Sequence, residues 1–388
     1  MKPGKKYAQA AWKQCSKVFE EATKAQQSDR MDSMSRKVLE VLKKAMYYHF
    51  NHFADFFSHY LFQYFCNLQS YSAKVEKYEQ LNEVYSHRNY LEKKVLRKVQ
   101  AMRQILNASL EPGEIEVSKL ESVCKELTVI KEEGCFFINS HINSLILRLY
   151  EIQGRNLEII QLGNEGIQES SPIGGARIYY NYLIQSYTIV KKFDQARAAS
   201  DLALEGLKKG NTYNYIMVNK IAIEFHAQKY EDAYSIFREV VPEGYDRRIP
   251  EYFQILKGYF SILARAGLLQ IEDKFRIGRF LNEVPHYSRD KSGQNMNILI
   301  LQILYYLGRD NGRIIDKLDA IYEYNRANGA GRAKQFITAL IQLIKKGFNS
   351  GKVEFELPGT VNLGIELIPY QKLWEITLTL VNMKTMAK

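Results

Sequence analysis

The chain has 388 residues and a formal net charge of +11; 46% of its residues are hydrophobic and 25% are charged. These proportions are typical of a globular protein and exclude extended disorder, and no run of roughly 18 apolar residues predicts a membrane span. Only 23 Gly and 8 Pro residues are present, which favours long helices over tight turns. The basic start lacks a following apolar segment and the four cysteines lack CxxC spacing, so we expect a cytoplasmic protein without a signal peptide.

The first third of the chain contains most of the excess positive charge. Residues 1–103 include 19 Lys and Arg residues against 10 Asp and Glu residues. Its densest stretch consists of Lys93, Lys94, Arg97, Lys98 and Arg103. The spacing of four predicts that the first four side chains share one helical face. Such a basic stripe is either a solvated helix face or a surface for nucleic acid or another anionic partner, and the latter is our alternative hypothesis for the function.

The segment 47–66 is the strongest candidate for a metal site. It contains ten aromatic residues and three of the seven histidines. His49, His52, Asp55 and His59 follow spacings of three, three and four, which predicts that they share a helical face. Histidines at such spacings are able to converge on one metal ion, but about 15 Å of helix separates the first from the last. We therefore expect a polar strip between aromatic faces, with no metal or other cofactor.

From residue 5 to about residue 347 the apolar residues recur at spacings of three, four and seven. This pattern predicts helices of roughly 12–20 residues, and one stripe extends from Val38 through Phe53 to Leu68. Short breaks rich in Gly, Pro, Asn and Ser fall at 27–32, 111–114, 169–175, 210–212, 242–250, 288–293 and 328–331. Helices joined by such connectors pack as antiparallel neighbours, so the predicted fold class is all-α.

The end of the chain has a different pattern. Val353, Phe355 and Leu357 alternate with other residues, and the alternation resumes over residues 361–367 after a Pro-Gly pair at 358–359. This period of two predicts a small β-hairpin, and the next apolar segment, 370–383, fits either a helix or a strand. We expect this tail to cap the exposed end of a helical array.

An internal repeat lies in the middle of the chain. Residues 192–196 (Lys-Phe-Asp-Gln-Ala) and 229–233 (Lys-Tyr-Glu-Asp-Ala) are 37 residues apart. Each predicts the corner of a helix–turn–helix unit, with a small residue where two helices approach closely. Weaker copies begin near Tyr150 upstream and near Phe275 and Tyr305 downstream.

These corners resemble the tetratricopeptide (TPR) repeat family, most clearly over residues 177–240. The family's positions are filled here by Leu183, Tyr187, Ala196, Ala203, Ala233 and Phe237. Ile184, Ile221 and Glu224 depart from the family pattern, and the step of 37 residues exceeds the usual step of about 34. The resemblance implies TPR-like packing with longer loops, and HEAT-type pairing is the structural alternative.

The sequence therefore predicts three regions: basic helices over residues 1–133, TPR-like repeats over 134–347 and a C-terminal cap over 348–388. The resemblance implies an α-solenoid scaffold or sensor that binds a protein or peptide partner in its concave groove. It places in that groove His141, Arg148, Asn181, Gln185, Tyr215, Asn219 and His226. The HExxH, GxSxG, Walker A and EF-hand patterns do not occur, so we expect neither catalysis nor a cofactor, and we interpret the glycine-containing segment 328–334 as a linker.

Overall fold

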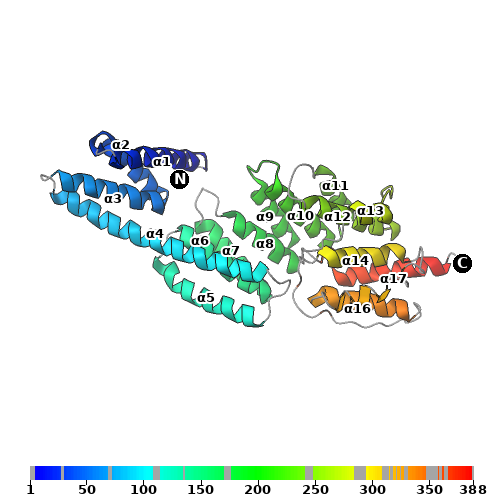
Figure 1. The fold of residues 1–388 in the computed structure, drawn as a ribbon. Coiled ribbons are helices and arrows are strands. Elements are labelled where there is room, and N and C mark those ends of the chain that lie inside the picture. Colours follow the sequence, from blue (N-terminus) through cyan, green and yellow to red (C-terminus); the bar gives the residue numbers. More distant parts are fainter. Residues whose placement is uncertain are drawn as a thin grey trace. The chain divides into compact units, whose positions relative to one another are not determined.

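The computed structural model shows a helical protein (Figure 1). It describes residues 5–27, 30–68, 72–107, 114–133, 136–169, 176–240, 248–283, 294–307, 314, 318–319, 321–323, 325–326, 331–346, 357, 361 and 366–386. No β-strand occurs among these residues, which confirms the all-α prediction. The C-terminal β-hairpin is not supported, because none of the described tail residues is in a strand. Val353, Phe355, Leu363 and Ile365 lie outside the described residues.

The described residues form a succession of helices along the chain. The first half forms α1 (Lys5–Gln27), α2 (Met31–Tyr47), α3 (Asn51–Asn67), α4 (Ser72–Asn107), α5 (Glu114–Glu133), α6 (Phe136–Ile152), α7 (Asn156–Glu169) and α8 (Ala176–Ile189). The second half forms α9 (Phe193–Leu204), α10 (Asn211–His226), α11 (Tyr230–Glu239), α12 (Arg248–Arg265), α13 (Ile277–Glu283), α14 (Gln294–Tyr306), α16 (Gly331–Lys345) and α17 (Tyr370–Met386). The segment that fitted either a helix or a strand is therefore the helix α17.

One predicted helical stripe is interrupted. The stripe from Val38 to Leu68 is broken between α2 and α3, where His49 has a left-handed φ of 57°. The amide of His49 donates to the carbonyl of Met46 at 3.2 Å, and the amide of Phe50 donates to that of Ala45 at 2.8 Å. These hydrogen bonds satisfy the last carbonyls of α2. The sequence did not reveal this break because the corner contains no Gly or Pro.

Contacts divide the chain into two compact units. The N-terminal unit comprises Met1–Leu106, Glu114–Leu149 and Gln161–Tyr179, and the C-terminal unit comprises Asn107–Gly113, Tyr150–Ile160 and Tyr180–Lys388. The division passes through α6, α7 and α8, so these helices contribute residues to both units.

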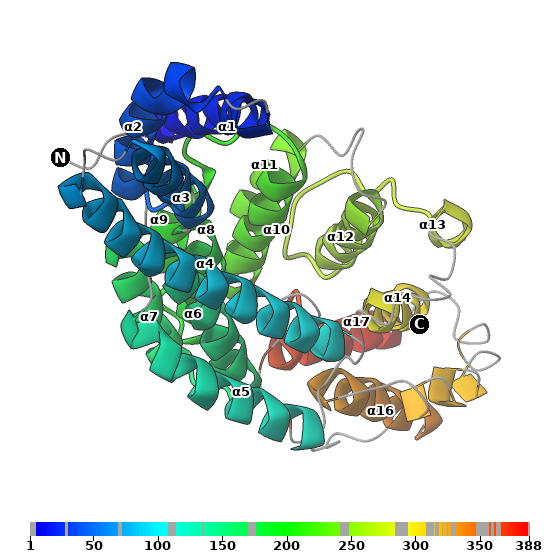
Figure 2. The same ribbon diagram turned by 60° about the vertical axis from the view of Figure 1, so that its left-hand side comes forward.

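The core of the N-terminal unit is rich in aromatic side chains. Helices α1, α2 and α3 pack against one another, as Figure 2 shows. Phe50 and Phe53 are buried, and the Trp12 ring lies 4.9 Å and 4.8 Å from their rings. The hydroxyl of the buried Tyr60 donates to the carbonyl of Met31 at 3.1 Å. The aromatic residues predicted to form helical faces thus join α3 to α1 and α2.

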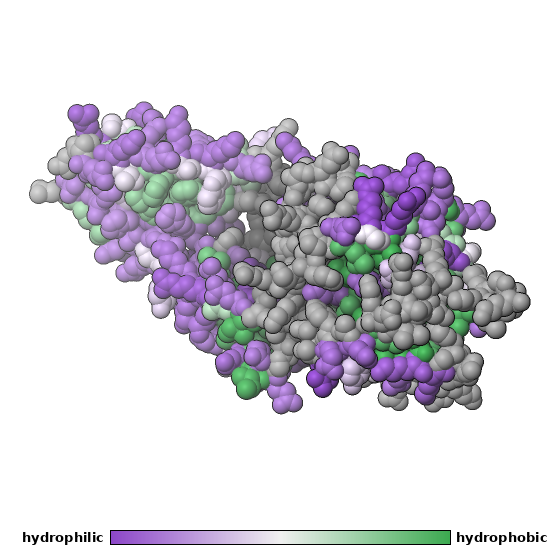
Figure 3. Space-filling model, turned by 45° about the vertical axis from the view of Figure 1, so that its right-hand side comes forward, coloured by the Kyte–Doolittle hydropathy of each residue, from purple (hydrophilic) through white to green (hydrophobic). Residues whose placement is uncertain are grey.

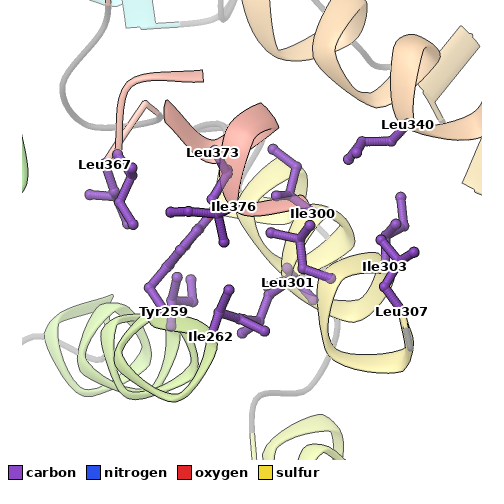
Figure 4. Packing of buried hydrophobic residues seen from close by; sticks show 14 of the residues in the cluster. Tyr259, Ile262, Ile300, Leu301, Ile303, Leu307, Leu340, Leu367, Leu373 and Ile376 are labelled. Atoms are coloured by element: carbon purple, nitrogen blue, oxygen red, sulfur yellow. The ribbon is translucent and has the colours of Figure 1, made fainter. Parts of the chain in front are cut away.

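The core of the C-terminal unit is built from aliphatic and aromatic side chains of α10–α14, α16 and α17. Figure 4 shows Tyr259 and Ile262 of α12, Leu301 of α14 and Leu373 of α17 around one apolar space, and all four are buried. Helices α12 and α14 approach closely at Gly258, where a Cβ atom would lie 2.2 Å from a methyl carbon of Leu301. Glycine is therefore the residue that this helix crossing can accommodate.

The same backbone corner recurs every 37 residues in the C-terminal unit. Gly154, Lys191 and Gln228 have left-handed φ angles of 69°, 60° and 58°. Each corner amide donates to the carbonyl three residues earlier, and the next amide donates to the carbonyl five residues earlier. Both hydrogen bonds satisfy carbonyls at the end of a helix. Ala196 and Ala233, which follow the last two corners, are fully buried, as expected for the small residues of the repeat.

The described tail is anchored by a buried ion pair. Arg332 of α16 donates to the carboxylate of Glu366 from Nε at 2.7 Å and from Nη2 at 3.0 Å. Its Nη1 donates to the carbonyl of Leu357 at 2.6 Å. The Glu366 carboxylate also accepts the amide proton of Tyr370, the first residue of α17, at 2.9 Å. Segment 328–334, interpreted from the sequence as a linker, therefore also contains an arginine that holds the tail.

Candidate functional site

The seven side chains predicted to line a groove are divided between the two units. His141 and Arg148 of α6 belong to the N-terminal unit, and the other five belong to the C-terminal unit. Burial and the nearby positive charge of Arg103 lower the pKa of His141. The five residues of the C-terminal unit, all on α8 and α10, are the starting point for the candidate site.

Four of these five residues form a patch on two helices. Gln185 of α8 donates from Nε2 to the hydroxyl of Tyr215 of α10 at 3.5 Å. Asn181 lies one turn before Gln185, and Asn219 lies one turn after Tyr215, so each shares a helical face with its neighbour. Tyr215 is 46% exposed, whereas Asn219 is 7% exposed. The patch thus combines an exposed ring with amide groups that are largely covered.

The same patch extends to a third helix that the sequence did not indicate. Tyr252 of α12 is close enough to Tyr215 for their hydroxyls to interact electrostatically, and burial is the main cause that raises the pKa of Tyr252. We refer to Asn181, Gln185, Tyr215, Asn219 and Tyr252 as the amide–tyrosine strip. Its residues come from α8, α10 and α12, and both α9 and α12 pack against α10.

Two amide atoms of the strip have no hydrogen-bond partner. The Oδ1 atom of Asn181 and the Nδ2 atom of Asn219 are both buried and unpaired. A buried polar atom left in this state costs about 1–3 kcal/mol. After a change of side-chain rotamer, either atom could pair with a ligand without breaking a hydrogen bond that it already makes. The new hydrogen bond would therefore contribute almost its full free energy to binding.

His226 does not belong to the strip. Its Nε2 atom lies 2.9 Å from the carbonyl oxygen of Glu366, so the histidine of α10 binds the tail of the chain. Burial is the largest cause that lowers its pKa, and the neutral ring donates its Nε2 proton to this carbonyl. The prediction that His226 faces a partner has to be corrected for this contact, which joins residues far apart in the sequence.

Glu224 forms a buried ion pair that the sequence did not indicate. It departs from the TPR pattern, and its carboxylate accepts two hydrogen bonds from Arg197 of α9, each at 2.7 Å. Arg197 also donates to the exposed Asp194 at 2.8 Å. The carboxylate of Glu224 is 5% exposed, so a paired arginine compensates its burial. The ion pair joins α9 to α10, which contributes two residues to the strip.

The basic stripe of α4 is partly neutralised. Lys98 forms an ion pair with Glu126 of α5, and Lys94 lies 3.8 Å from the same carboxylate. Arg103 donates to the hydroxyl of Ser144 at 3.2 Å, whereas Lys93 and Arg97 are exposed. The stripe is therefore divided, because Lys94 and Lys98 face α5.

The histidine segment does not form a metal site in the described structure. His49 lies in the corner before α3, not on its face, and the His52 ring lies 5.4 Å from the ring of Phe19. Asp55 accepts hydrogen bonds from Ser86 at 2.5 Å and from Asn89 at 2.7 Å. Within the described residues, no group of three or more His, Cys, Asp or Glu side chains is placed to hold a metal ion.

Comparisons of the chain with protein families, with curated proteins and with solved structures find no match. Among the helices that the structure describes, none combines the length and apolarity needed to cross a membrane. Hydrophilic side chains cover much of the coloured surface in Figure 3, interrupted by small apolar patches. The function is therefore inferred from the geometry of the candidate site.

Proposed function

We propose that this protein is a non-enzymatic, TPR-like helical-repeat scaffold that binds a protein or peptide partner through the amide–tyrosine strip. The recurrent corners at Gly154, Lys191 and Gln228 support the repeat. Helices α9, α10 and α11 pack in chain order, as stacked hairpins do. The buried free thiols of Cys15 and Cys124 are in keeping with the reducing cytoplasm that the proposal assigns to the protein.

The unpaired amide atoms of Asn181 and Asn219 support the proposal most strongly. The chain reverses direction before α9 and again after it, so α8 and α10 point in the same direction. The two amides then lie about one turn to either side of the Gln185–Tyr215 contact, roughly 12 Å apart along the helices. An extended peptide covers this length with about four residues, and its backbone supplies both donors and acceptors.

The structure favours this surface over the basic stripe. Two of the five basic side chains of the stripe already pair with Glu126, and a third, Arg103, donates to Ser144. Nucleic-acid binding requires basic side chains that are free to contact phosphates and displace the counterions of the nucleic acid. The alternative function is therefore less well supported than peptide binding.

The test begins with a peptide selected from a random display library on the immobilised full chain. Its affinity is then measured by fluorescence anisotropy for the wild type and for the variants Asn181→Leu, Asn219→Leu and Tyr215→Ala. We expect each variant to weaken binding at least tenfold. The matched control is Tyr90→Ala, which removes an equally helical tyrosine that is 62% exposed on α4. Unchanged affinity in all three strip variants, or selection of no peptide, would refute the proposal.

A further inference from the structure

The C-terminal unit contains a cavity that includes none of the strip's residues. Its volume is about 370 Å³, and it lies among α11, α12, the connection over residues 271–276 and α13. Pockets for small ligands usually enclose about 300–1,000 Å³ and combine apolar walls with a few polar groups. The size of this cavity is that of a ligand with one ring and a short polar chain.

Aromatic side chains form the walls of the cavity. The Phe260 ring of α12 lies 5.2 Å from that of Tyr234 and 5.1 Å from that of Phe237, both on α11. The lining also contains Phe275 and Phe280, whose rings are 5.5 Å apart. Rings at these separations contact edge to face or at a tilt, so they hold one another in place and present fixed apolar surfaces. Such walls favour a planar aromatic group.

Ser261 of α12 provides a buried polar group that faces this cavity. The residue is 2% exposed and its Oγ atom has no hydrogen-bond partner. A serine inside a helix commonly donates to the carbonyl four residues earlier, and here that hydrogen bond is absent. A change of the Ser261 rotamer toward the cavity would let the hydroxyl pair with a polar atom of a ligand, which would satisfy it.

Two basic side chains among the described residues of the cavity lining form no ion pair. Lys274 pairs with Glu272 at 2.8 Å, and Asp273 accepts the amide proton of Phe275 at 3.1 Å. Lys257, one helical turn before Ser261 on the same face of α12, and Arg276 also line the cavity, and both are exposed. A lysine and an arginine beside an unpaired hydroxyl favour an anionic oxygen group on the ligand.

We propose that this cavity binds an aromatic carboxylate. The ring lies between the walls formed by Phe260 and Phe275, and the carboxylate accepts hydrogen bonds from Lys257, Arg276 and the Ser261 hydroxyl. This chemistry belongs both to a free aromatic acid and to the C-terminal aromatic residue of a peptide. The site is independent of the function proposed for the amide–tyrosine strip.

Isothermal titration calorimetry on the full chain tests the proposal. The probes are 3-phenylpropionate and its neutral amide, and an alanine-rich pentapeptide that ends in phenylalanine, as the free acid and as the amide. For an acid of this size we expect a dissociation constant of about 1 mM or tighter. Each amide should bind at least tenfold more weakly than its acid. Binding of both acids supports a peptide source, and binding of the small acid alone supports a free metabolite.

The variants Lys257→Met and Ser261→Ala should each weaken the binding of 3-phenylpropionate at least fivefold. Lys346→Met, which removes an exposed lysine outside the cavity, should leave the binding unchanged, and circular dichroism verifies the helical content of every variant. Equal binding of acid and amide, no binding of either acid, or full affinity in both cavity variants would overturn the proposal. The comparison of acid with amide uses the wild type, so it remains decisive even if a variant fails to fold.

Discussion

The ion pair between Arg332 and Glu366 allows a quantitative test of how the tail is held. The Glu366 side chain is 3% exposed and that of Arg332 is 12% exposed. The carboxylate accepts two hydrogen bonds from Arg332 and one from the Tyr370 amide. The substitution Glu366→Gln removes the negative charge and leaves the guanidinium buried without a counter-charge. Breaking such a pair costs about 3–5 kcal/mol, and since glutamine retains one acceptor oxygen we expect a loss of about 3 kcal/mol.

The assay uses the tryptophan next to the ion pair. The chain has two tryptophans, and Trp374 lies one turn into α17, where its ring is 6.4 Å from that of Phe336. In a Trp12→Phe background, Trp374 fluorescence during urea unfolding reports on the C-terminal unit alone. The free energy of unfolding from this transition should fall by about 3 kcal/mol in Glu366→Gln.

An exposed ion pair of α17 provides the matched control. Glu375→Gln removes an exposed partner of Lys372, and exposed pairs of this kind contribute at most about 1 kcal/mol. A double-mutant cycle with Arg332→Met should give a coupling energy above about 1 kcal/mol. A loss in Glu366→Gln as small as that in Glu375→Gln would show that the pair does not hold the tail.

Three further substitutions test other parts of the structure. Asn219→Leu removes a buried amide nitrogen that has no hydrogen-bond partner, so it should raise the free energy of unfolding by about 1 kcal/mol in urea titrations. His226 has a lowered pKa, so the unfolded chain binds the proton more readily and stability falls as pH drops below about 6.5. His226→Gln should therefore reduce the difference in unfolding free energy between about pH 7.5 and 5.5. Gln228→Gly relieves a left-handed φ of 58° and should stabilise the protein by about 1 kcal/mol, as measured by its thermal midpoint.

Each of these substitutions has a matched control. Asn297→Leu removes the acceptor of the Tyr259 hydroxyl and should destabilise the unit, whereas a gain like that of Asn219→Leu would contradict our account of unpaired amides. His59→Gln changes an exposed histidine and should leave the pH dependence intact; an equal effect would remove the special role of His226. Ala227→Gly lies next to the corner at a right-handed φ of −77°, and stabilisation there would contradict the strain argument.

The sequence was sufficient to predict the helices and several of their boundaries. The Gly-Asn-Thr break at 210–212 marks the start of α10 at Asn211. The break between α2 and α3 was missed because His49, a non-glycine residue, adopts the left-handed conformation. The hairpin predicted from the alternation in the tail is not supported by the described residues. Leu367 and Ile368 are both buried in a bend, which apolar spacing alone does not distinguish from a strand.

The candidate site was only partly accessible from the sequence. The TPR resemblance implied that Gln185 and Tyr215 share one groove, and in the structure their side chains form a hydrogen bond. The contact of His226 with Glu366 joins residues 140 positions apart, and no local pattern contains such information. The role of Tyr252 was hidden for the same reason, because its proximity to Tyr215 depends on the packing of α12 against α10.

Photo-crosslinking from position 215 tests the central claim most directly. A benzoylphenylalanine residue introduced in place of Tyr215 in the full chain is irradiated with the peptide selected from the display library, and the products are located by mass spectrometry. The same residue in place of Tyr90, which is also exposed, provides the comparison. We predict a crosslink to the peptide from position 215 and none from position 90. A peptide that binds with undiminished affinity yet crosslinks only from position 90 would contradict the assignment of the strip as the binding surface.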